Sequence, residues 1–149
     1  MRIQTILNRV EKFKSFVYRD SRLEEQGDGP ALIVRIEPRK NNRPFCSGCG
    51  KVGPTYDRLQ ERRFEFIPLR GILVFFAYRM RRVDCMLCGV IVEMVPWCDG
   101  KNQMTRTYRL YLATWAKRFS WSEVGSIFRT SWNSVCRAVE HVVEWSLVH

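Results

Sequence analysis

Apolar and polar residues follow two different periods along this chain. Leu32, Val34 and Ile36 occupy every second position beside the charged Arg35 and Glu37, which predicts a strand with one buried face. A turn is expected just before it, at residues 28–30. Near the N-terminus, apolar residues at helical spacing predict a short amphipathic helix: Ile3, Ile6, Leu7 and Val10.

A β-hairpin is predicted between residues 63 and 83. Residues 63–67 alternate and are rich in aromatic side chains, and residues 68–71 contain Pro68 and Gly71 in positions suited to a turn. Residues 72–83 then form a long strand, apolar at first and basic later. A further strand is expected over residues 90–95.

From Thr105 the apolar residues recur at helical steps. Thr105 is the expected N-cap of a first helix, and its apolar face comprises Tyr108, Tyr111, Leu112, Trp115, Ala116 and Phe119. A second helix is predicted over residues 122–128, with a serine as N-cap, and a third from Ser131 to about residue 143. The link of only a few residues between them is typical of a helix-turn-helix.

The finer pattern agrees with this motif. Core residues are expected at Val124, Phe128, Val135 and Ala138, and Gly125 lies where the two helices approach most closely. Arg129 departs from the motif, because glycine is frequent there and a left-handed conformation costs other residues about 1 kcal/mol. The outward face of the third helix, with Asn133 and Arg137 able to bind adenine and guanine edges, comprises Ser131, Trp132, Asn133, Cys136 and Arg137. The alternative is an ordinary three-helix unit without a DNA role.

Composition and charge narrow the class of protein. The 149 residues are 46% hydrophobic and 13% aromatic, enough for a core, and carry 25 basic against 15 acidic side chains. This excess lies between residues 39 and 137 and favours a polyanion such as nucleic acid as partner, although a solvated basic surface is the alternative. We expect no membrane association, because no apolar run approaches the roughly 20 residues that cross a bilayer. A cytoplasmic bacterial protein, on the nucleoid when DNA-bound, is expected.

Four of the six cysteines form two C-x-x-C-G motifs. Cys46 and Cys49 precede Gly50, and Cys85 and Cys88 precede Gly89. Two such knuckles can supply four thiolates to one Zn²⁺ ion, in a zinc ribbon extended by the hairpin between them. A disulfide framework and a thioredoxin-like redox pair are the alternatives. Cys98 and Cys136 are expected to be small buried or partly exposed residues, although Cys98 is near enough in sequence to compete for the metal.

Basic side chains gather on the predicted hairpin near its metal end. Arg79, Arg81 and Arg82 are candidate contacts to DNA phosphates, together with Arg62 and Arg63. A solvated strand face explains the same residues without any DNA. With Arg129 of the helical turn, the expected DNA-binding set is Ser131, Trp132, Asn133, Arg137, Arg129, Arg79, Arg81 and Arg82.

Several segments resemble the N-terminal half of ISL-type insertion-sequence transposases. They are FCSGCG, YDRLQERRFEFIPLRG, YRMRRVDCMLCG, VPWCDGKNQ and WAKRFSWSEVGSIF, and the resemblance extends from about Thr5 to His149. In that family a zinc-binding segment precedes a helix-turn-helix and then a DDE catalytic domain with an RNase H-like fold. The resemblance implies that Cys46, Cys49, Cys85 and Cys88 are zinc ligands and that residues 122–139 recognise terminal inverted repeats.

These observations predict an α+β fold, a zinc ribbon with an extended β-hairpin followed by a three-helix helix-turn-helix module. Residues 1–38 are expected to pack on the ribbon at 39–100, and residues 101–149 to form the helical module. The carboxylates show no pattern for two-metal chemistry, and residues 145–149 end in mid-helix. We therefore expect a DNA-binding part of a transposase, no enzyme by itself, truncated before the catalytic domain.

Two other functions stay open from the sequence. One is a protein-interaction module that oligomerises with, or inhibits, full-length transposase, and an exposed Phe75 or Tyr78 on the hairpin suits it. The other is an enzyme, either a thiol oxidoreductase or a nuclease.

Overall fold

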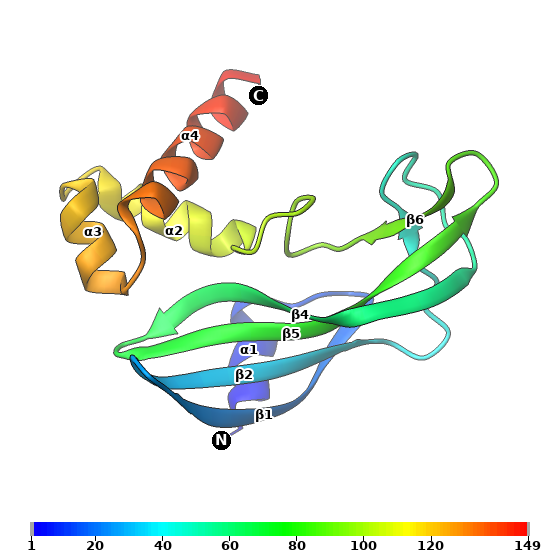
Figure 1. Ribbon diagram of the computed structural model, residues 1–149, viewed down its shortest axis with the longest axis horizontal. Helices are drawn as coiled ribbons and strands as arrows, with labels where there is room; N and C mark the ends of the chain where they lie inside the picture. The colour runs from blue at the N-terminus through cyan, green and yellow to red at the C-terminus, as the bar shows by residue number, and fades with distance from the viewer. Residues whose placement is uncertain (1, 149) are drawn as a thin grey trace.

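Two long β-hairpins build the sheet. β1 (Phe16–Gln26) and β2 (Gly29–Pro38) form the first, and β4 (Thr55–Leu69) and β5 (Ile72–Cys85) form the second. In the computed structural model, which describes residues 2–148, the hairpins are joined by parallel pairing between β2 and β5. The result is a curled sheet with helices beside it, an α+β fold as expected (Figure 1).

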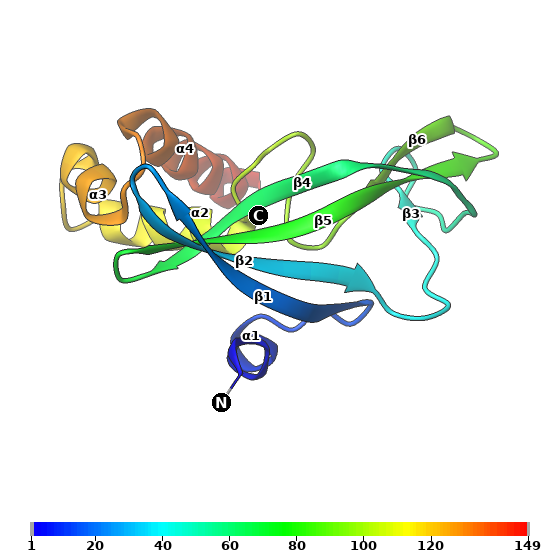
Figure 2. The same cartoon turned by 60° about the horizontal axis from the view of Figure 1, so that its bottom comes forward.

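The second half of β5 leads to the cysteine knuckles. There β5 pairs with β6 (Gly89–Met94), and β6 pairs with the two-residue β3 (Phe45–Cys46). Figure 2 shows β3 and β6 at the opposite end of the long hairpin from α3 and α4. The predicted hairpin and the strand near residues 90–95 are thus confirmed, and both hairpin strands are longer than expected.

Aromatic residues fill the space enclosed by the sheet. Trp97, 1% exposed, follows β6 and lies at the centre of this core. Four aromatic rings surround it at centroid distances of 4.9–5.8 Å: Phe13, Phe16, Phe64 and Tyr78. The N-terminal helix α1 (Ile3–Val10) adds Leu7 to the same core. Tyr78 is only 2% exposed, so the exposed Tyr78 expected for a protein-interaction surface is wrong.

Three helices form a second, smaller core. They are α2 (Arg106–Ala116), α3 (Trp121–Phe128) and α4 (Trp132–Val148), and the buried residues they share include Leu112, Val124, Val135 and Ala138. Thr105 is the N-cap of α2, as predicted. The N-cap of α3 is Ser120, in a capping box with Glu123, so the helix begins earlier than expected. No helix within residues 2–148 is long and apolar enough to span a membrane.

Backbone hydrogen bonds fasten the helices to the sheet. The N–H of Glu65 in β4 donates to the carbonyl of Gln103 at 2.7 Å, and the N–H of Thr105 donates back to the carbonyl of Glu65 at 2.9 Å. The residue that caps α2 is therefore also bound to the sheet. A second attachment is made by Arg129, described below.

A buried ion pair crosses from β5 to β6. Arg81 and Glu93 are 2% and 3% exposed, and their closest atoms, Nη2 and Oε2, are 2.8 Å apart. Glu93 also accepts from the backbone N–H of Arg81 and from the Tyr78 hydroxyl, while the Arg81 guanidinium donates to Asn42. Because its donors are used inside the protein, Arg81 is not available to a DNA phosphate, and we do not retain it as a contact.

We predict that Glu93→Ala destabilises the protein by about 3–5 kcal/mol, because it leaves the Arg81 charge buried and unpaired. Urea denaturation of both proteins measures this difference. The matched control is Asp57→Ala, which breaks the half-exposed pair with Arg82 and is expected to have little effect because water solvates the freed guanidinium. Equal losses in the two variants would contradict the structural role of the buried pair.

Candidate metal centre and nucleic-acid interface

The four knuckle cysteines converge at the end of the β4–β5 hairpin. The Sγ atoms of Cys46, Cys49, Cys85 and Cys88 all lie within 4.8 Å of one another, and those of Cys49 and Cys85 are 3.6 Å apart. Four sulfurs around a tetrahedral Zn²⁺, each at about 2.3 Å, would be separated by about 3.8 Å. All four cysteines are free thiols, so the arrangement suits a metal ion better than a disulfide pair.

Glycines allow the knuckles to close. Gly50 and Gly89, which each follow a knuckle, have φ angles of +75° and +78°, a conformation that L side chains rarely adopt. Gly48 is needed for a different reason, because a Cβ there would lie 2.9 Å from the Sγ of Cys88. The third residue of the first knuckle therefore has to be small for the two knuckles to meet.

Hydrogen bonding and charge favour a cation among these thiols. Backbone N–H groups of Cys49 and Gly48 lower the pKa of Cys46 to about 7. The nearby Cys46 thiol raises the pKa of Cys88 instead. Thiolates this close repel one another, and a divalent cation removes that repulsion. Cys98 is outside the cluster, and its thiol donates to the carbonyl of Asn102 at 2.6 Å.

The turn between α3 and α4 has the close approach expected of a helix-turn-helix. A Cβ on Gly125 would lie 2.9 Å from the carbonyl oxygen of Thr130. Arg129 adopts the left-handed conformation, with φ 54° and ψ 43°, in spite of its side chain. Its guanidinium donates to the carbonyls of Gly71 and Asp28, which lie at the tips of the two hairpins. These bonds offset the backbone strain and attach the helical turn to the sheet.

The N-terminal turn of α4 presents polar and aromatic groups to solvent. Ser131, Trp132 and Asn133 are exposed, and the Trp132 ring, half exposed, lies 5.5 Å from that of Trp121. The Ser131 hydroxyl accepts from the backbone N–H of Ser134 and so caps the helix. Among these residues Asn133 is the exposed side chain best suited to a bidentate contact with a base edge.

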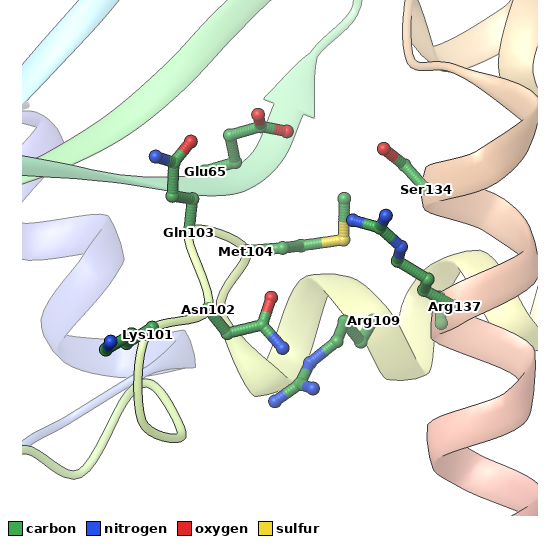
Figure 3. A pocket seen from close by; sticks show the side chains of 9 residues that line it. Glu65, Lys101, Asn102, Gln103, Met104, Arg109, Ser134 and Arg137 are labelled. Carbon is green, nitrogen blue, oxygen red and sulfur yellow. The ribbon is translucent and has the colours of Figure 1, made fainter.

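The basic candidates lie in three different places. Arg79 and Arg82 are on β5, where Arg79 donates to the carbonyl of Leu59 and Arg82 pairs with Asp57. Arg129 is held by the hairpin tips. Arg137 is exposed, but Figure 3 shows it pointing from α4 toward Met104, into a pocket beside β4. Its position suits a role different from base reading, to which we return below.

An acidic residue missed by the sequence patterns organises the loop before α2. Asp99 pairs with Arg106 and Arg109 of α2, and its carboxylate lies 3.7 Å from the Nε2 of His141 in α4. Hydrogen bonding from Arg106 is the main reason why the pKa of Asp99 is lowered. The one signal in the sequence for this charge cluster is that Arg106 and Arg109 follow Asp99 closely and lie three residues apart on a predicted helix.

Comparison with known proteins finds the transposase for insertion sequence element IS1557 of Mycobacterium tuberculosis, in strains CDC 1551 / Oshkosh and ATCC 25618 / H37Rv. The chain is 30% identical to each over 132 residues, which cover 87% of this chain and 30% of each relative. No protein-family model and no solved structure matches the chain. The similarity supports a relationship to insertion-sequence transposases. The chain spans about 30% of the length of these two relatives.

We predict that Gly125→Ala destabilises the helical module by about 1–3 kcal/mol, because the added methyl group has to displace the Thr130 carbonyl. Thermal unfolding followed by circular dichroism measures the change. Gly27→Ala is the control, since a Cβ at Gly27 meets no atom within 4 Å. An unchanged midpoint for Gly125→Ala would show that the turn can open without cost.

Proposed function

We propose that this chain is a DNA-binding part of an insertion-sequence transposase that recognises the terminal inverted repeats of its element. The observation that carries the proposal is the glycine-dependent turn between α3 and α4, which leaves the first turn of α4 exposed. The similarity to the IS1557 transposase supports it independently, because moving an element requires recognition of its ends.

In this proposal α2, α3 and α4 act as a helix-turn-helix. Asn133 and Trp132 at the start of α4 would enter the major groove and read base edges. Arg79 and Arg82 on β5 would hold phosphates at a distance from the recognition helix. Arg129 contributes by fixing the helical turn on the sheet and not by contacting DNA directly.

We further propose that the four-cysteine site binds one structural Zn²⁺. Soft thiolates and a tetrahedral arrangement suit this ion, and residues 39–100 would then form a zinc ribbon. The ion would join the first knuckle, which begins at β3, to the second knuckle, which forms the turn between β5 and β6. The expected absence of a catalytic domain stays a prediction.

We predict that Asn133→Ala reduces preference for transposon-end DNA over a scrambled duplex by about 1–3 kcal/mol, roughly 5- to 150-fold, because a bidentate contact to a base is lost. Competition binding at several salt concentrations measures this. Arg79→Ala is the comparison. Loss of a phosphate contact should weaken binding to both duplexes alike and reduce the slope of log affinity against log salt concentration by about one. A wild-type protein that binds both duplexes equally at every salt concentration would contradict sequence-specific recognition.

We predict that Cys85→Ser lowers zinc content below one ion per chain and unfolds the knuckle end, because one of four thiolates is lost. Elemental analysis and far-ultraviolet circular dichroism measure the two effects. Cys98→Ser is the matched control, because it changes a buried cysteine outside the cluster and should retain the ion. Dichroism unaffected by a strong chelator would contradict a structural role for the metal.

A further inference from the structure

A polar pocket lies where the sheet meets the helical module. It has a volume of about 420 Å³ and is formed by β4, residues 101–104, α2 and α4. Figure 3 shows Glu65 of β4 and Ser134 and Arg137 of α4 pointing toward one another, with the Met104 side chain between them. The volume is within the range of small-molecule sites, about 300–1,000 Å³.

The pocket has a buried floor and an accessible rim. Met104, Arg109 and Ala138 are buried, whereas Lys101, Asn102 and Arg137 are exposed. Lys101 and Arg137 make no ion pair within residues 2–148, and the side chains of Asn102 and Gln103 donate no hydrogen bond there. The rim therefore offers cationic and neutral donors that are free to bind a ligand from solvent.

Arg109 forms part of the pocket floor and carries one unpaired donor. Arg109 is 4% exposed and one Nη donates to Asp99, but its Nε is buried and has no hydrogen-bond partner within residues 2–148. A buried donor left unpaired costs free energy of about 1–3 kcal/mol. Lys101 and Arg137 line the same pocket, so an anion held by them would offset part of this cost electrostatically.

We propose that this pocket binds a phosphodiester group of the DNA backbone, an inference that rests on the proposed DNA-binding function. Arg137 and Lys101 supply the positive charge, and the amide groups of Asn102 and Gln103 supply neutral donors. The pocket residues Ser134, Arg137 and Ala138 lie within the first two turns of α4, so a phosphate flanking the recognised bases can reach the pocket. Arg137 is then a phosphate contact and not a base reader.

Substitution of Glu65 tests the proposal in the opposite direction, because it removes a negative charge from the pocket. Glu65 is the one carboxylate among the lining residues, and it makes no ion pair with Arg137. A negative side chain beside the phosphate opposes binding, so its removal should strengthen binding while loss of a cation weakens it. Because both substitutions are neutral glutamines, the two variants separate electrostatics from a general loss of structure.

The first experiment measures ligand binding in the pocket with a dinucleotide in place of duplex DNA. Protein labelled with ¹³C at the methionine methyl groups is titrated with a thymidine dinucleotide, which carries one phosphodiester, with thymidine alone and with inorganic phosphate. The dinucleotide should shift Met104 in the pocket and leave the fully exposed Met86 of the second knuckle unchanged. Arg137→Gln should abolish the shift, and Glu65→Gln should tighten binding. Arg9→Gln is the control, because it removes an exposed charge from α1, outside the pocket.

The second experiment uses duplex DNA. Arg137→Gln should weaken target and scrambled duplexes by the same factor and lower the salt slope by about one ion, whereas Arg9→Gln should leave the slope unchanged. A loss confined to the target duplex would make Arg137 a base reader and overturn the proposal. It would also be overturned if thymidine or inorganic phosphate alone shifted Met104, or if the dinucleotide did not. Absence of any duplex binding by the wild type would instead overturn the proposed function, and the dinucleotide titration would still decide whether the pocket takes a phosphodiester.

Discussion

Backbone pairing along β5 is the constraint on which the rest of the structure depends. On one edge β5 pairs with β4 along nearly its whole length; on the other it pairs first with β2 and then with β6. One strand therefore positions both the aromatic core around Trp97 and the cysteine knuckles. The Arg81–Glu93 ion pair lies where β5 changes its partner on this edge from β2 to β6, and it links β5 to β6.

Much of the positive charge of the chain is used internally. Arg81 is buried against Glu93, Arg63 pairs with Glu24, and Arg62 donates to backbone carbonyls at Gly100 and Asn102. Arg106 and Arg109 are held by Asp99. The net charge of +10 is therefore larger than the positive charge that would be available to a DNA backbone. The cations left for that purpose are fewer and lie at defined places on the surface.

The attachment of the helical module to the sheet links base recognition by α4 to phosphate binding in the pocket, the two activities proposed above. Thr105 caps α2 and bonds to β4, and Arg129 reaches both hairpin tips from the turn before α4. The proposed phosphate pocket is lined by Glu65, whose carbonyl accepts the bond from Thr105. A duplex bound by α4 would thus contact a helix and a sheet whose relative orientation is already fixed, which lowers the entropic cost of binding.

Features that depend on neighbouring residues could be predicted from the amino-acid sequence. Turn residues, N-caps such as Thr105, the small Gly125 and the repeated knuckles act over a few positions, where backbone conformation and side-chain size decide the outcome. Strand β1 escaped detection because it is rich in charged residues and buries only its first part. The tertiary structure alone decided the parallel β2–β5 pairing, the burial of Arg81 and Tyr78, and the meeting of Glu65, Arg109 and Arg137 around one pocket. These depend on contacts between residues far apart in the chain, and the same arginine is solvated or paired according to which strand or loop is brought against it.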